Sequence, residues 1–127
     1  MSKDVNQSLY DTLYRTLGEL GKVFDRYPDS DEPYPYIQLG MIQIIPRVTK
    51  SYWLGLADVT VDVWGGWEDR KKVSDIANQI LVSSNRMDTL ETGHDVSLEA
   101  CSVEMMIDQS TATDLWRGHV LLEFIIH

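Results

Sequence analysis

The stretch from Leu56 to Ser84, LADVTVDVWGGWEDRKKVSDIANQILVSS, combines two hydrophobic periods. Its first part alternates strictly, which is typical of a strand with one buried face. The predicted buried face holds Ala57, Val59, Val61 and Val63, and the other face holds Asp58, Thr60, Asp62 and Trp64. From Glu68 to Ser83 the apolar residues follow the i, i+3, i+4 spacing of an amphipathic helix. Between the two, we expect Gly65-Gly66 to provide the backbone angles of a sharp exit from the strand.

The composition is that of an ordinary globular domain. The chain has 127 residues, of which 43% are apolar and 24% charged, so we expect a single domain over residues 1–127. Its one cysteine, Cys101, excludes an intramolecular disulfide and indicates a reducing compartment. The segment MSKDVNQS lacks the apolar region of a signal peptide, and no apolar run approaches the roughly 20 residues of a membrane span. We therefore expect a soluble, intracellular protein that binds no membrane.

The net charge of −9 argues against binding nucleic acid through a basic surface. Affinity in such surfaces comes largely from neutralising phosphates with Lys and Arg. The only basic cluster, residues 70–72, follows Glu68 and Asp69 at the start of the predicted helix. We interpret it as a solvated helix face and not as a phosphate site.

The chain before the central stretch predicts one more helix and one more strand. Asp4 is a suitable cap for a helix whose apolar stripe continues over residues 5–24. Residues 25–35 hold three of the four prolines and are expected to form a loop. Residues 36–45 are mostly apolar on both sides, which predicts a strand covered on two faces, and we expect Pro46 to end it.

The segment 46–55, PRVTKSYWLG, is longer than the roughly two to five residues of a tight hairpin. We therefore expect part of it to extend both flanking strands as a projecting ribbon. It carries Arg47, Lys50 and Trp53, and aromatic and Arg residues on a projecting loop are typical of protein interfaces. An equally weighted alternative is a solvent-exposed loop whose Trp53 folds back onto the core.

Two strands are predicted after the helix, over residues 96–108 and 115–127. The whole pattern predicts an α+β fold, with a mostly antiparallel four-stranded sheet and two helices packed on one face, in the order α-β-β-α-β-β. Two helices cover one face only, so Leu121, Ile125 and Met106 would lie on the open face. A contiguous exposed apolar patch marks an interaction surface, and we expect self-association or a large partner.

No catalytic, cofactor or metal site is predicted. Asp58 and Asp62 share a strand face but lie about 13 Å apart, too far for a shared metal or a glycosidase carboxylate pair, so we interpret them as solvated or subunit-facing. Cys101 and His119 could pair across neighbouring strands as nucleophile and base. Nothing supplies an oxyanion hole or an orienting residue, and a buried structural cysteine in an inward-facing row is the preferred interpretation. We expect a protein that is not an enzyme.

Five segments occur in an order that is similar to that of a known family. An N-terminal helix leads to a strand that begins at Pro35-Tyr36, and a strand of the type x-V-x-V-D-V-W follows at residues 58–64. An amphipathic helix over residues 68–83 and a closing strand over residues 121–126 complete the series. Over nearly the whole chain, this order resembles the tail completion or tail terminator proteins of long-tailed, siphovirus-type bacteriophages.

The resemblance implies a ring of subunits, commonly six, that caps the head-proximal end of the tail tube. Such a ring stops tube polymerisation and presents a surface to the head connector. The implied partners are further copies of the chain, the tail tube protein and head–tail connector proteins, while DNA passes through without specific binding. The implied location is the head–tail junction of the virion, after assembly in the host cytoplasm. The net negative charge suits a lumen that DNA traverses, if the acids face inward.

The family transfers no catalytic residues, and the interface residues proposed here come from their positions in the chain. They are Arg47, Lys50, Trp53, Asp58, Asp62, Leu121 and Ile125. Three other functions remain open at this point: a head–tail connector or tail tube protein of the same machinery, an unrelated self-associating binding module, and a small enzyme that uses Cys101 and His119.

Overall fold

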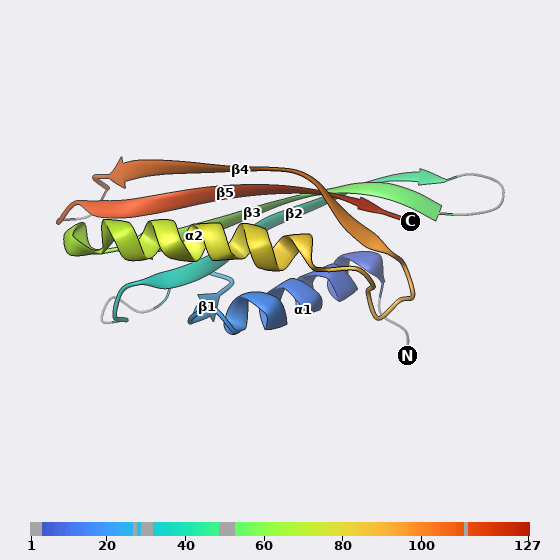
Figure 1. The fold of residues 1–127 in the computed structure, drawn as a ribbon, viewed down its shortest axis with the longest axis horizontal. Coiled ribbons are helices and arrows are strands. Elements are labelled where there is room, and N and C mark those ends of the chain that lie inside the picture. The colour runs from blue at the N-terminus through green and yellow to red at the C-terminus, as the bar shows by residue number, and fades with distance from the viewer. Residues whose placement is uncertain (1–3, 27, 29–31, 49–52, 111) are drawn as a thin grey trace.

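The structure, a computed structural model, describes residues 4–26, 28, 32–48, 53–110 and 112–127. Two helices lie on one side of a five-stranded sheet, as Figure 1 shows. The elements in chain order are α1 (Val5–Gly18), β1 (Val23–Phe24), β2 (Tyr36–Val48), β3 (Trp53–Gly65), a 3₁₀ turn (Trp67–Asp69), α2 (Arg70–Asn85), β4 (Val96–Asp108) and β5 (Leu115–Ile126). The strand order in the sheet is β1-β2-β3-β5-β4, antiparallel except for β1 and β2.

The α+β class and the placement of both helices on one face are as predicted, but the sheet has five strands instead of four. The additional strand, β1, is only two residues long and pairs Val23 with Ile37 in a parallel register. The apolar stripe predicts that these residues belong to the first helix, which instead ends at Gly18. Gly18 and Gly21 both weaken a helix at this point, by roughly 1 kcal/mol each relative to alanine.

The start of α1 is as expected. Asp4 caps the helix, and its side chain accepts a hydrogen bond of 2.7 Å from the Gln7 amide. The side chain of Gln7 donates to Asp11 at 2.9 Å. The two hydrogen bonds tie the first two turns together along one side of the helix.

The core lies between the helices and the sheet. The face of β3 predicted to be buried, Ala57 to Val63, is at most 1% exposed, and β5 contributes a matching row. The fully enclosed aliphatic and aromatic side chains include Leu9, Leu13 and Leu17 of α1, Val73 and Ile80 of α2, and Val120, Leu122 and Phe124 of β5. Each contributes roughly 1.5–3 kcal/mol through removal of its apolar surface from water.

The turn from β3 into α2 needs Gly65 for a different reason from the one expected. Gly65 does not adopt a positive φ; among the described residues only Gly93 does, at 88°. A Cβ atom at Gly65 would lie 2.4 Å from Cγ2 of Val73, which is closer than real contacts allow. The glycine is therefore required for space, because α2 packs directly on the end of β3.

Strand β2 departs from its prediction in two ways. It continues through Pro46 to Val48, and only one of its faces is covered. Ile37 and Leu39 are buried, whereas Met41 and Ile45 are exposed. Beyond its short pairing with β1, β2 is the edge of the sheet, where a proline is tolerated because its nitrogen has no neighbouring strand to bond.

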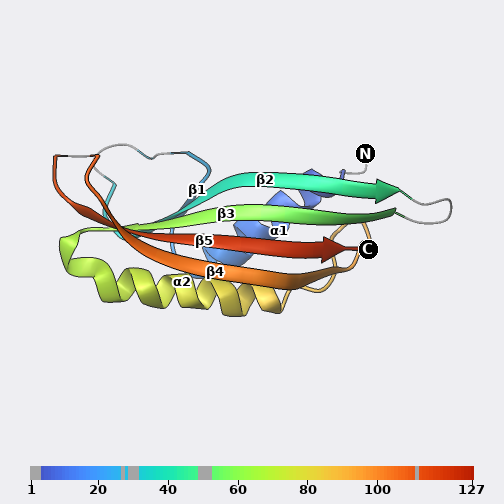
Figure 2. The same cartoon turned by 90° about the horizontal axis from the view of Figure 1, so that it is seen from above.

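The predicted projecting ribbon is present. Pairing between β2 and β3 continues to Val48 and Trp53, whereas pairing between β3 and β5 ends at Gly55 and Ile126. The two strands consequently extend past β5, and Figures 1 and 2 show them reaching beyond the rest of the sheet. We call the part of β2 and β3 beyond this last β5 pair the ribbon.

Among the described residues, no helix has the length and apolar character needed to span a bilayer.

Candidate interaction surface

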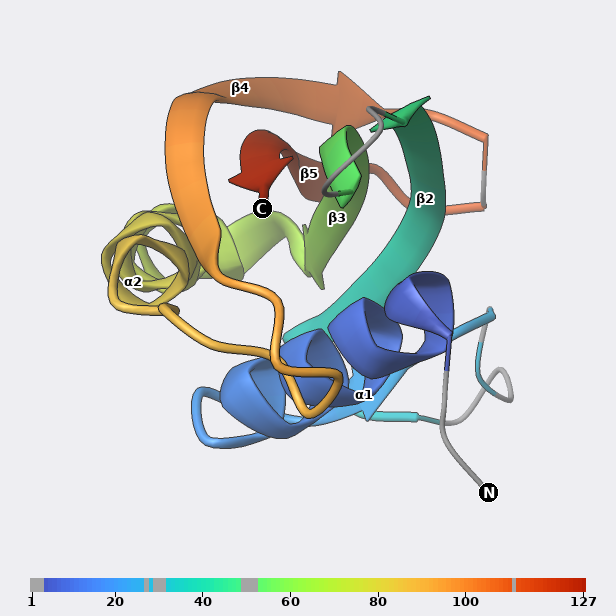
Figure 3. The ribbon, with the colours of Figure 1, turned by 90° about the vertical axis from the view of Figure 1, so that its right-hand side faces the viewer.

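One face of the sheet has no helix over it. Figure 2 shows the four long strands in front of the helices, and the end-on view in Figure 3 places α1 and α2 on the same side. The side chains that point away from the helices define what we call the uncovered face. They are Gln38, Met41, Gln43, Ile45 and Arg47 of β2, Leu56, Asp58, Thr60, Asp62 and Trp64 of β3, Ala100, Ser102, Glu104 and Met106 of β4, and Arg117, His119, Leu121, Glu123 and Ile125 of β5.

Apolar side chains are open to solvent on this face, as the sequence predicted. Leu121 is 44% exposed, Ile45 is 45% exposed and Met41 is 58% exposed. Ile125 and Met106 are on the same face but are half-buried. Exposed groups of this kind mark interaction surfaces in soluble proteins.

A hollow of about 430 Å³ lies in the middle of the uncovered face. Its rim is apolar at Met41 and Leu121, and its polar lining includes Gln43, Thr60 and Ser102. Two carboxylates, those of Asp58 and Glu123, also line it, and these residues are direct partners across β3 and β5. The hollow therefore combines apolar walls with two adjacent negative charges.

Asp62 lies in a different environment from Asp58, although both belong to the same strand face. Arg117 donates to both oxygens of Asp62, at 2.8 and 3.2 Å, and His119 Nδ1 lies 2.7 Å from Oδ1. The Arg117 guanidinium also lies over the Trp64 ring, 5.3 Å from its centroid, which is within the range of a cation–π contact. The interpretation of Asp62 as solvated is therefore wrong: it is 9% exposed and is held by two side chains of β5.

Asp108 closes the same face at the end of β4. The hydroxyl and the amide of Ser110 both donate to its Oδ1. These hydrogen bonds, together with the charge of Arg117, lower the pKa of Asp108 below its usual value of 3.8. The uncovered face thus contains both satisfied carboxylates, Asp62 and Asp108, and the unbonded pair in the hollow.

Cys101 and His119 are not brought together. Cys101 is paired with Leu122 and so points to the helix side of the sheet, whereas His119 is on the uncovered face with Asp62. The prediction that Cys101 is buried is also wrong, because its side chain is exposed. β4 is an edge strand with a bulge between Leu98 and Ala100, and Cys101 lines a hollow between this part of β4 and the last turns of α2.

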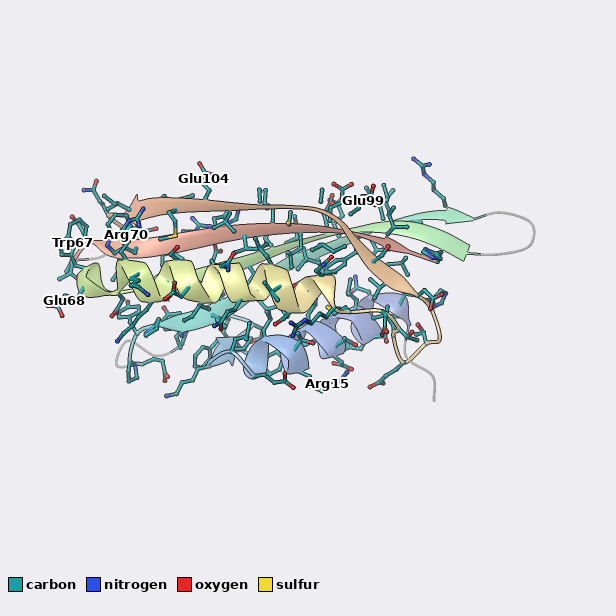
Figure 4. The ribbon with its side chains drawn as sticks, in the orientation of Figure 1. Arg15, Trp67, Glu68, Arg70, Glu99 and Glu104 are labelled. Atoms are coloured by element: carbon teal, nitrogen blue, oxygen red, sulfur yellow. The ribbon has the colours of Figure 1, made fainter. Side chains whose placement is uncertain are left out.

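A second cluster of aromatic and basic groups lies at the start of α2, where Figure 4 labels Trp67 and Arg70. Trp67 stacks on Trp116 at 5.2 Å, and the Arg70 guanidinium lies 5.1 Å from the Trp116 ring. The adjacent Lys71 is paired with Asp75 at 2.8 Å. This hydrogen bond raises the pKa of Lys71. The basic cluster is consistent with the predicted solvated helix face.

The seven predicted interface residues do not form one group. Asp58, Asp62 and Leu121 lie on the uncovered face, with Leu121 opposite Thr60 and so between the two aspartates, and Ile125 lies on it nearer to the ribbon. Arg47 is exposed on the ribbon itself. Lys50 and the side chain of Trp53 lie outside the described residues. Sequence reasoning missed Glu123 and Arg117, because only the β3–β5 register reveals which residues of β5 lie opposite the two aspartates.

Within the described part of the chain, no group of three or more His, Cys, Asp or Glu side chains is arranged to hold a metal ion. The surface is therefore characterised by shape, apolar contact and charge.

A family model, that of tail completion protein gp17, matches residues 12–126. The chain belongs to this family. The resemblance derived from the order of its segments is thereby confirmed, and the chain is a structural protein of bacteriophage tails. A chain in the solved structure of the virion of a native gene transfer agent (GTA) particle has the same fold, with a TM-score of 0.72, 15% sequence identity and 98% coverage of both chains. No curated protein sequence matches.

Proposed function

We propose that the chain forms a ring that caps the head-proximal end of the tail tube, stops tube polymerisation and provides the surface for head joining. The match of the tail completion family to residues 12–126 carries this proposal. The role is one of geometry, without a catalytic group or a cofactor. The partners are further copies of the chain, the tail tube protein and the head–tail connector proteins, and the site of action is the head–tail junction after assembly in the host cytoplasm.

Two features of the fold support a ring. A head-to-tail ring needs two different surfaces on each subunit, which meet in the same way at every contact. The ribbon and the uncovered face are two such surfaces, one projecting and one hollowed. The gene transfer agent chain with the same fold is part of a virion, which supports assembly with other virion proteins.

The charge supports the same proposal. A net charge of −9 disfavours sticking of the subunits to DNA, because a tight complex needs cations to replace those condensed on the phosphates. Subunits of this composition suit a channel that DNA crosses without being held. About six copies in a ring would present the same acidic groups repeatedly around the opening.

The proposal is tested with purified tail tube protein that is allowed to polymerise in the presence or absence of the chain. We expect tubes that stop growing and carry extra density at one end in negative-stain images. Tubes that grow without a stop while the chain is incorporated along their length would favour a tail tube protein. Binding to head connectors without any effect on tubes would favour a connector. No binding to tubes or to connectors would overturn the proposal.

A further inference from the structure

We infer that the hollow on the uncovered face receives the Arg47 side chain of a second copy of this chain. The inference rests on the proposed function, because it names a contact by which the ring would form. Its basis is a pair of carboxylates and an arginine for which the described part of the chain provides no side-chain hydrogen bond or ion pair.

The two carboxylates lie side by side in the hollow. Asp58 of β3 and Glu123 of β5 are directly opposite in the antiparallel register, so their side chains emerge on the same face with Cβ atoms roughly 4.5–5.5 Å apart. Both residues are half-buried. Like charges directly opposite one another in a sheet are destabilising. Within the described chain neither carboxylate has a hydrogen bond or an ion pair, in contrast to Asp62 two pairs further along the same strands.

The lining of the hollow suits an arginine. Met41 and Leu121 supply apolar contact for the methylene groups of a long side chain. The adjacent carboxylates suit a guanidinium, whose planar set of donors binds carboxylates in pairs. A further acidic side chain on the same face is that of Glu104 of β4, which Figure 4 shows pointing away from the helices. The charge of this region therefore favours a cationic group of the partner.

Most described cations of the chain already have a partner. Six of them form ion pairs, namely Arg15, Lys22, Arg26, Lys71, Lys72 and Arg117. A seventh, Arg70, lies over Trp116. Arg47 and Arg86 form no ion pair among the described residues. Arg86 follows the end of α2 in the helix layer, whereas Arg47 lies on the ribbon that projects beyond the sheet. Among the described cations, Arg47 is therefore the one placed to reach another molecule.

Arg47 does not reach the hollow of its own chain. Asp58 is opposite Gln43 on β2, and Arg47 lies four residues further along, which is about 13 Å of strand. Arg47 is therefore too far from Asp58 of its own chain to form an ion pair with it. This separation does not prevent a contact between two copies. The ribbon of one subunit extends past its own sheet and can therefore cover the uncovered face of the next subunit. Such a contact joins unlike surfaces and closes into a ring when the rotation permits.

The test uses charge reversal on both sides of the contact. Arg47→Glu and, separately, the double variant Asp58→Lys/Glu123→Lys are compared with the unchanged chain by light scattering and sedimentation over a concentration series. We expect each variant alone to lose self-association by at least about tenfold in dissociation constant. An equimolar mixture of the two variants restores it, because each reversed group then meets an opposite charge on the other variant.

Arg86→Glu is the matched control, since it makes the same charge change at the other unpaired arginine. Circular dichroism and thermal unfolding verify that all variants are folded. The inference is overturned by an unchanged chain that stays monomeric at every soluble concentration, by reversal variants that associate normally, or by a mixture that does not recover. Unchanged chains that associate through Arg47 but do not stop tube growth would instead remove the proposed function and leave this contact in place.

Discussion

The two faces of the sheet are built from alternate residues of the same strands, yet their side chains differ in exposure and in bonding. Leu121 and Leu122 are neighbours on β5, and the first is 44% exposed while the second is 2% exposed. Asp58 and Asp62 are on one face of β3, and of the two only Asp62 has side-chain hydrogen bonds to other described residues. The difference shows that the exposure and the hydrogen bonding of a side chain depend here more on its neighbours than on its own residue type. Those neighbours belong either to a helix or to the adjacent strand.

The largest effect should come from a matched pair of truncations on β5. We expect Leu122→Ala to lower the free energy of unfolding by about 2–5 kcal/mol, because it leaves a cavity under the helices. Leu121→Ala, on the uncovered face, should cost less than about 1 kcal/mol. Urea denaturation measures both. Equal losses would mean that the uncovered face is already packed against something in solution.

Next in size is the enlargement of Gly65. Alanine there places a Cβ atom 2.4 Å from Val73 and 2.9 Å from Cβ of Asp69, so we expect Gly65→Ala to destabilise the fold by about 1–3 kcal/mol. Gly18→Ala is the control, since no atom lies within 4 Å of its added Cβ, and it should be neutral or stabilising by up to about 1 kcal/mol. Thermal unfolding measures the stability of both variants. A Gly65→Ala variant more stable than Gly18→Ala would contradict the steric requirement for glycine at position 65.

A smaller effect separates the two aspartates of β3. Asp62→Asn removes the charge that Arg117 and His119 contact, and we expect a loss of about 1–2 kcal/mol, reduced by the partial exposure of Arg117. Asp58→Asn removes one member of a like-charged pair and should change stability by less than about 0.5 kcal/mol, with a small gain expected. Chemical denaturation at low ionic strength gives the sharpest comparison. A larger loss for Asp58→Asn would show that its carboxylate is satisfied in solution.

The smallest effect is a shift in the titration of Asp108. The pKa of this carboxyl is lowered mainly by the Ser110 hydroxyl, so Ser110→Ala should move the pKa up toward 3.8. A carboxyl with a lowered pKa stabilises the fold above its unfolded-state pKa, and this contribution disappears as the pH falls through the folded-state value. Carbon-detected NMR titration measures the shift, with Ser97→Ala at the other end of β4 as control. An unaltered Asp108 pKa in Ser110→Ala would assign the lowering to the backbone amide and Arg117.

The regular parts of this fold were predictable because local period decides them. The strand at Ala57–Val63, the helix that follows it and the row Val120 to Ile126 all have one apolar face. The position of Leu121 on the uncovered face was predictable because two helices can cover only one face of a sheet. β1 was not predictable, because two residues carry no period and their pairing with β2 depends on the path of the intervening loop.

The site was predictable only in outline. The positions of Asp58 and Asp62 on one face could be deduced from alternation, but not that Arg117 and His119 hold one of them and Glu123 faces the other. These contacts depend on the register between β3 and β5, which are separated by some 50 residues of chain and are aligned by tertiary packing. The exposure of Cys101 depended likewise on where α2 ends over β4 and on a bulge that the alternation does not reveal.

The close fit of α2 on the sheet has an evolutionary consequence. Val73 lies over two glycines from different strands, and an added Cβ would be 2.4 Å from it at Gly65 and 3.0 Å from it at Gly118. Enlarging either glycine should therefore cost less stability after Val73 has become smaller, so the order in which mutations arise affects which of them survive. Across members of the family that keep this packing, these three positions are expected to covary.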